Sequence, residues 1–215
     1  MKVLRRSGWL STTPEDFGRA VLSRCDEITL QAGEPVYRAG DSTGGIYGVV
    51  TGRVELHLPH LREDRSLTHI GGPGYWFGDL AAVSGKPRRF DVRARDDSRL
   101  ARLSRAEILR LTGEMPEGWR YLATMMMSNL ELALNYVEAV KAKDSVTRVR
   151  AVLRNLATHC GNDDGIVGVS QDDLAALAGL SRKTVNSAMK RLEGTGEVTV
   201  SYRSVRINPG VWAPA

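Results

Sequence analysis

Residues 119–144 contain no glycine or proline and consist mostly of residues that favour helices, so this stretch is expected to form one long helix. Its seam residues recur at alternating spacings of four and three, the pattern of a two-stranded coiled coil. The members of this seam are Leu122, Met126, Asn129, Ala133, Tyr136 and Val140. A lone helix cannot bury such a seam, so it packs either on its own domain or on the same helix of a second subunit. Its position between two regions of different composition favours the second arrangement, a homodimer in which Asn129 would help to fix the register.

The region before this helix, from Glu27 to about Leu103, is built of short apolar runs interrupted by glycines. This pattern is typical of β-strands joined by tight turns. Apolar and polar residues alternate from Arg53 to Leu58, which predicts a half-buried strand, and the polar segment 61–66 predicts a hairpin loop. Many short strands with glycine at their corners predict an antiparallel barrel or roll.

The composition excludes several classes of protein. The 215 residues are 42% hydrophobic and 26% charged, which is near the average for globular proteins and sufficient for two domains. No segment has the roughly 18 consecutive apolar residues that cross a bilayer, and the first residues do not resemble a signal peptide, so we expect a cytoplasmic protein without a membrane partner. The two cysteines, Cys25 and Cys160, exclude a disulfide framework, a four-thiolate iron–sulfur cluster and a cysteine-only zinc site.

The most informative segment lies after the long helix, between Val169 and Gly210. Ser170, with Asp173 three residues later, predicts a capped helix start, and Gly179 predicts the end of that helix. Ser181 can cap a second helix that has apolar residues on one side and polar residues on the other. Two short helices with a glycine-containing turn between them predict a helix-turn-helix, although a generic helical hairpin with a solvated basic face is the alternative.

The residues after the second helix predict a β-hairpin, or wing, because two valine-rich runs flank the polar residues 201–204. The major groove of B-DNA admits one helix, and its base edges offer hydrogen-bond acceptors to Arg and Lys and mixed edges to Asn. The formal net charge of +5 permits a partner such as double-stranded DNA. The residues expected to contact DNA are Ser181, Arg182, Lys183, Thr184, Asn186, Ser187, Lys190, Tyr202 and Arg203.

In these segments the chain resembles the cAMP receptor protein and FNR (CRP/FNR) family of bacterial transcription regulators. GLSRKTVNSAMKRLE is similar to the family's recognition helix, GDSTGGIYGVVTGRVEL to its β-roll, and WFGDLAAVSGKPRRFDVRA to its cyclic-nucleotide cassette. The resemblance implies an α+β fold: an N-terminal cupin-like antiparallel β-roll in residues 1–117, a dimerisation helix in 118–143 and a C-terminal winged helix-turn-helix in 144–215, with a hinge at Asp144 and Ser145. It also implies a homodimer on a palindromic operator, RNA polymerase as a partner and a small-molecule effector.

The cassette departs from the family's pattern at positions that hold cyclic AMP. The resemblance places the effector pocket at Gly78, Asp79, Leu80, Arg88, Arg89, Ala133 and Leu134. Asp79 is one methylene shorter than the family's glutamate, and the bulky Arg89 stands where the family has a small hydroxyl residue. Each polar group of the nucleotide left unpaired would cost about 1–3 kcal/mol. We therefore expect that cyclic AMP does not bind in the usual way, and the identity of a cofactor or effector stays open, including the case of none.

The recognition helix also departs from the family's pattern, because Lys183 replaces a glutamate and Ser187 replaces an arginine that many members carry. Glutamate accepts a hydrogen bond from cytosine N4, and lysine cannot. We expect Arg182 still to read a guanine while the remaining base preference differs.

Functions of two other classes compete with transcriptional control. A cupin-like metal enzyme would use His57, His60 and His69, which are also the candidate axial ligands of a haem, but we expect no carboxylate beside them on the same strand face. The second alternative is a nucleotide-binding scaffold without DNA activity. The sequence favours a transcription regulator with no catalytic residues and no metal site, and it favours packing over a redox role for Cys25 and Cys160.

Overall fold

The computed structural model describes residues 1–42, 44–59, 66–160 and 165–208. The chain divides into two compact units, one formed by Met1–Pro59 with Ile70–Glu131 and the other by His60–His69 with Leu132–Ala215. The division falls within a continuous helix, between Glu131 and Leu132, whereas the sequence places domain boundaries at residues 117 and 143. The predicted hairpin loop lies almost entirely outside the described residues.

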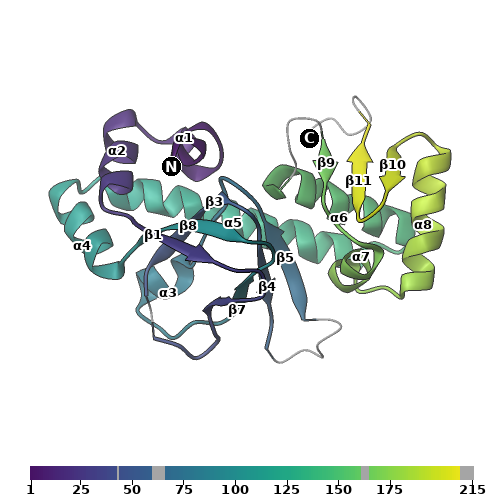
Figure 1. The fold of residues 1–215 in the computed structure, drawn as a ribbon, viewed down its shortest axis with the longest axis horizontal. Coiled ribbons are helices and arrows are strands. Elements are labelled where there is room, and N and C mark those ends of the chain that lie inside the picture. Colours follow the sequence, from purple (N-terminus) through teal and green to yellow (C-terminus); the bar gives the residue numbers. More distant parts are fainter. Residues whose placement is uncertain (43, 60–65, 161–164, 209–215) are drawn as a thin grey trace. The chain divides into compact units, whose positions relative to one another are not determined.

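The first unit contains the β-roll. The strands of the roll are β1 (Asp26–Leu30), β2 (Pro35–Tyr37), β3 (Ile46–Thr51), β4 (Val54–His57), β5 (Leu67–Gly71), β6 (Trp76–Phe77), β7 (Asp91–Ala94) and β8 (Ser98–Leu103). The division into units falls within β5, between His69 and Ile70. They form two four-stranded sheets in the orders β1-β8-β3-β6 and β2-β7-β4-β5 (Figure 1). The pairs of β8 with β1 and β3, of β3 with β6, and of β7 with β2 and β4 are antiparallel, so the predicted antiparallel roll is confirmed. Gly52 turns the chain from β3 to β4 with φ at 77°, where a Cβ would collide with Ser98.

The first unit also contains helices that precede, interrupt and follow the strands of the roll in the sequence. They are α1 (Lys2–Arg6), the 3-10 helix η1 (Trp9–Thr12), α2 (Glu15–Ser23), α3 (Asp79–Ser84), α4 (Arg105–Glu114) and the first part of α5 (Gly118–Lys141). Trp9 lies edge-on to Phe17 and Trp76 at ring-centroid distances of 6.1 and 5.3 Å, and its indole N–H donates to the Tyr121 carbonyl at 2.6 Å. Leu122 of α5 is buried in the same core. The start of α5 is therefore fixed to the β-roll by apolar burial and by one long-range hydrogen bond.

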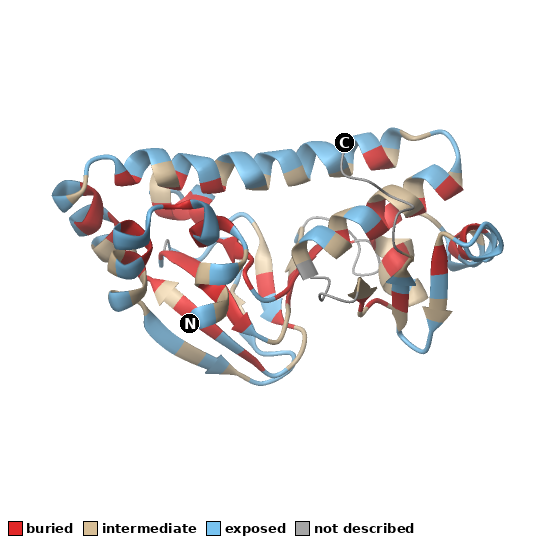
Figure 2. Cartoon of the chain, turned by 90° about the horizontal axis from the view of Figure 1, so that it is seen from above, coloured by how far each residue is buried: buried red, intermediate tan, exposed pale blue. Residues whose placement is uncertain are grey.

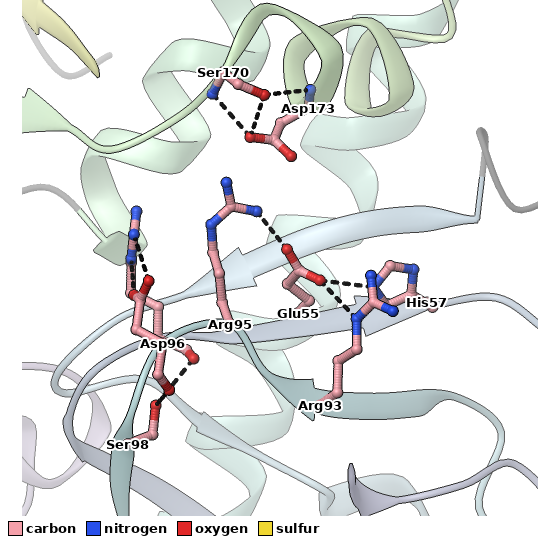
Figure 3. Close-up of polar contacts among 9 residues, drawn as sticks. Glu55, His57, Arg93, Arg95, Asp96, Ser98, Ser170 and Asp173 are labelled. Atoms are coloured by element: carbon pink, nitrogen blue, oxygen red, sulfur yellow. Dashed lines mark hydrogen bonds and ion pairs between the residues drawn. The ribbon is translucent and has the colours of Figure 1, made fainter. Parts of the chain in front are cut away.

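The alternation expected along β4 is wrong at Glu55, which is only 7% exposed. Its carboxylate accepts hydrogen bonds from Arg93 Nε at 2.8 Å, from His57 Nε2 at 3.1 Å and from Arg95 (Figure 3). Burial alone would raise the pKa of Glu55, but the hydrogen bonds from His57 and Arg93 and the charge of Arg95 lower it to about 2. These neighbouring cations allow a carboxylate to stay ionised in a buried position.

The second unit is a small α/β domain. Its elements after α5 are α6 (Ser145–Cys160), β9 (Ile166–Val167), α7 (Gln171–Ala178), α8 (Arg182–Gly194), β10 (Val198–Ser201) and β11 (Ser204–Ile207). β11 lies between β10 and β9 in an antiparallel sheet, and Val149, Leu153, Leu174 and Val185 are buried. The helix breaks between Lys141 and Ser145, where Asp144 accepts a hydrogen bond from the Thr147 amide at 2.9 Å. The predicted hinge coincides with this break, and its motion stays a prediction.

Candidate DNA-binding face and effector pocket

The helix α7 has the predicted start and end. The Asp173 amide donates to Ser170 Oγ at 3.1 Å, and the Ser170 amide donates back to Asp173 Oδ2 at 2.8 Å, which is a reciprocal capping box (Figure 3). Gly179 then ends the helix in the left-handed conformation, with φ at 61°. Both predicted ends of α7 are confirmed. They could be predicted because they depend on contacts between residues close in sequence.

The second helix, α8, begins after Ser181, whose hydroxyl accepts a hydrogen bond from the Thr184 amide at 3.1 Å. The hydroxyls of these two residues also bond to each other at 2.8 Å. Ser181 and Thr184 therefore fix the start of the helix, and their expected contacts with DNA stay a prediction. Four apolar side chains of α8, all at most 2% exposed, hold it on the domain: Val185, Ala188, Met189 and Leu192.

The opposite side of α8 is polar and exposed. The residues on it are Arg182, Lys183, Asn186, Ser187 and Lys190. Their spacing places them on one side of a 3.6-residue helix, with Arg182 and Lys183 in its first turn. A helix held by one apolar side, with exposed donors at its N-terminal end, can enter a DNA major groove.

The wing is the β10–β11 hairpin, in which Val198 pairs with Ile207 and Ser201 with Ser204. Tyr202 at its tip is 91% exposed, and Arg203 beside it has φ at 52°, a conformation that non-glycine residues seldom adopt. Tyr202 and Arg203, the two wing residues expected to contact DNA, therefore both lie at an exposed turn. An open groove of about 480 Å³ separates the start of α7 and Arg182 from the wing.

The predicted effector pocket contains an arginine that is already bonded within the chain. Arg88 is 4% exposed and donates to the carbonyls of Gly45 and Gly78 at 2.8 and 2.9 Å. Its guanidinium carbon lies 4.2 Å from the ring centroid of Tyr37 and 5.5 Å from that of Tyr47. The group that would hold a cyclic phosphate therefore already has two carbonyl and two aromatic partners within the chain.

Asp79 lies in the same pocket, 8% exposed, and burial raises its pKa. Its Oδ1 accepts a hydrogen bond from Asn129 Nδ2 at 3.0 Å, and the same nitrogen lies 3.3 Å from the Trp76 carbonyl. Asn129 was expected in the dimer seam, and the sequence carries no signal for its contact with Asp79, 50 residues away. Leu80, at 51%, and Arg89 are exposed, so the structure does not bring them into this cluster.

The long helix α5 presents a different apolar side from the expected one. Of the predicted seam, Leu122 is 2% exposed in the core of the β-roll unit, and Ala133 is exposed, as is Leu134 beside it. Met126, Tyr136 and Val140 are half-buried. The large exposed apolar residues from the middle of α5 onward are Met127, Leu130, Leu134 and Val137, at spacings of three, four and three. Figure 2 shows that much of this long helix is exposed. This exposed row lies beside the predicted seam, and we call it the α5 stripe.

The structure describes two of the three candidate histidines, His57 and His69. His57 bonds Glu55, so the expectation that no carboxylate lies beside it is wrong: residues two apart share a strand face. His69 is 6% exposed and burial lowers its pKa, while His60 lies outside the described residues. Among the described side chains, no group of three or more His, Cys, Asp and Glu residues could hold a metal ion. Burial raises the pKa of Cys25 to about 12, which disfavours the reactive thiolate.

Comparisons with known proteins match both units. Residues 27–114 match the model of the cyclic nucleotide-binding domain, and residues 147–208 match that of the Crp-like helix-turn-helix domain. The chain is 28% identical to the cyclic AMP receptor protein of Thermus thermophilus, over 90% of this chain and 88% of that one. The chain belongs to the CRP/FNR family.

This CRP/FNR chain is also 24% identical to the CRP-like cAMP-activated global transcriptional regulator of Mycobacterium tuberculosis, over 96% of this chain and 95% of that one. The structure of FixK2 from Bradyrhizobium japonicum shares its fold, with a TM-score of 0.72 over 85% of this chain and 92% of that one at 22% identity. The chain is a CRP/FNR-type transcription regulator with a cyclic nucleotide-binding-like domain and a DNA-binding helix-turn-helix, and the alternative of a metal enzyme or scaffold is not favoured. No helix in the described part of the chain is long and apolar enough to cross a membrane.

Proposed function

We propose that this regulator binds a palindromic operator as a homodimer and reads it with the exposed side of α8. The observation that carries this proposal is the division of α8 into an apolar side at most 2% exposed and a side that presents Arg182, Lys183 and Asn186 to solvent. Arg182 donates to the acceptors of a guanine, and Asn186 contacts a mixed base edge. Ser187 and Lys190, farther along the same side, contact base edges or phosphates.

The wing supports the same mode of binding. Tyr202 and Arg203 lie at an exposed turn of a hairpin whose other end is fixed, because Glu197 just before β10 accepts two hydrogen bonds from Arg150 of α6, at 2.7 and 2.9 Å. A positive side chain at such a turn neutralises DNA phosphates without reading sequence. Arg203 thus adds affinity, and the side chains of α8 add specificity.

Selection of binding sites from random DNA tests this proposal. We expect the wild-type protein to recover a two-part palindrome with a guanine in each half-site, and Arg182→Ala to lose the preference at that guanine. Arg203→Ala serves as a matched control, because removing a phosphate contact weakens binding to all sequences and leaves the motif unchanged. A wild-type protein that enriches no motif, or an Arg182→Ala variant that enriches the same motif, contradicts the proposal.

We propose that the homodimer forms through the α5 stripe rather than through the seam expected from the sequence. Leu122 is buried in the β-roll unit and Asn129 bonds to Asp79, so neither is free to meet a second subunit. The side chains of the stripe are 43–53% exposed and share one side of the helix. Parallel pairing of two copies would bury both stripes across a twofold axis, and would place the two α8 helices in symmetric positions for a palindrome.

We propose that the β-roll does not take cyclic AMP as the two relatives named for cAMP do. Arg88 would have to leave the carbonyls of Gly45 and Gly78 before it could bind a cyclic phosphate, and Asp79 is already bonded to Asn129. Titration calorimetry of the wild type with cyclic AMP is expected to show no saturable heat. A saturable heat that Arg88→Met abolishes contradicts the proposal. Under this proposal, either a different effector controls DNA binding or the protein has no effector. RNA polymerase is the downstream partner in both cases.

A further inference from the structure

An acidic side chain lies on the face that meets DNA in the proposed function. Asp172 is the second residue of α7, and its carboxylate Oδ1 lies 3.5 Å from Nη1 of Arg182. Both residues line the groove that separates α7 and α8 from the wing. Their side chains are 67% and 70% exposed, so both remain accessible to a ligand in that groove.

The backbone on each side of this ion pair is fixed. The capping box of Ser170 and Asp173 sets the start of α7, and Ser181 caps the start of α8 immediately before Arg182. A carboxylate in the first turn of a helix is favoured by the helix dipole. The ion pair of Asp172 with Arg182 is so exposed that it adds little to folding stability beyond this effect of the dipole.

The position is unfavourable for binding DNA as a polyanion. Binding to DNA of any sequence depends on neutralised phosphates, and a carboxylate in the groove opposes it. Discrimination between sequences depends instead on contacts with base edges, and a flexible arginine makes such contacts in many arrangements unless it is restrained. Water leaves the groove when DNA docks, which strengthens the interaction between Asp172 and Arg182.

We propose that Asp172 is a specificity-determining residue that positions Arg182. Its carboxylate holds the guanidinium toward one base and repels phosphates that would otherwise attract it. The inference rests on the proposed function, because it requires that Arg182 read a base. Asp172 therefore weakens binding to all DNA and raises the preference for the operator.

A double-mutant cycle tests this role with the full-length protein and two DNA duplexes, a site selected by the wild type and its scrambled counterpart, at two salt concentrations. We expect Asp172→Asn to bind scrambled DNA about 3- to 10-fold more tightly and to lose a similar factor of discrimination. Asp172→Glu keeps the carboxylate and retains most of the discrimination. In the Arg182→Ala background, Asp172→Asn still strengthens binding to all DNA but removes no further discrimination.

Glu15→Gln is the matched control, because it removes one negative charge from another exposed ion pair, that of Glu15 with Arg19 on α2. It should leave discrimination at the wild-type value, and the melting temperature of Asp172→Asn should fall only slightly, because the variant loses a carboxylate in the first turn of α7. If Arg182→Ala keeps full discrimination, the proposed function itself fails. Two results refute only the positioning role, provided that Arg182→Ala itself loses discrimination. In the first, Asp172→Asn keeps or increases discrimination. In the second, Asp172→Asn lowers discrimination as much in the Arg182→Ala background as it does in the wild type.

Discussion

Truncation of two leucines in the α5 stripe should separate the subunits of the dimer. Leu130 and Leu134 are 48% and 53% exposed in the single chain. Full burial of a leucine contributes about 1.5–3 kcal/mol, so the exposed half of each side chain contributes about 1 kcal/mol when a second subunit covers it. Leu130→Ala with Leu134→Ala removes four such side chains from a dimer, about 4 kcal/mol in total. The dissociation constant of the dimer should rise about 1,000-fold, because each 1.4 kcal/mol is a factor of ten.

Sedimentation equilibrium measures this constant directly, and a gel shift on a palindromic site should show the matching loss of DNA affinity. Leu109→Ala is the control, because this leucine is similarly exposed, at 45%, but lies on α4. Circular dichroism should show that the double variant keeps its helices. A folded double variant that dimerises as tightly as the wild type would refute the stripe as the interface. The seam expected from the sequence would regain support if Met126→Ala with Tyr136→Ala separated the subunits instead.

Three further changes act on stability. Ser170→Ala removes the capping box of α7 and should lower the free energy of unfolding by about 1 kcal/mol in urea titrations. The pKa of Glu55 falls from 4.5 to about 2 on folding, so its ionised form adds about 3 kcal/mol to the free energy of unfolding. This contribution is complete above pH 4.5 and is lost as the pH falls toward 2. Glu55→Gln should remove this pH dependence in urea titrations from about pH 7 to 3. Burial raises the pKa of Asp79, so its ionised form destabilises the fold at neutral pH and its protonation relieves this as the pH falls. Asp79→Asn should therefore be more stable than the wild type at neutral pH. Thermal melts of this variant should lack the pH dependence that the protonation of Asp79 causes.

Contacts between residues close in sequence could be predicted. The start of α7 at Ser170, its end at Gly179 and the start of α8 at Ser181 all follow from hydrogen bonds or backbone conformations within a few residues. The exposed side of α8 also follows, because four apolar residues at helical spacing fix the buried side. Most of the candidate DNA-binding face could therefore be predicted from the sequence. The ion pair of Asp172 with Arg182 could not, because it depends on the angle between α7 and α8.

Residues with partners far along the chain could not be predicted. Asn129 has the spacing of a seam residue, yet its amide bonds to a carboxylate 50 positions away. Glu55 has the alternation of a solvent-facing residue, yet Arg93 of the neighbouring strand and Arg95 just after that strand make its burial favourable.

The sequence by itself determined the order of the elements, the caps of the DNA-binding helices and the family. Only the tertiary structure decided which side of α5 stays exposed, since this helix has apolar residues around most of its circumference and the β-roll core buries one group of them, including Leu122 and Met125. Periodicity shows that a helix has a side to bury, and packing against the rest of the chain selects which one.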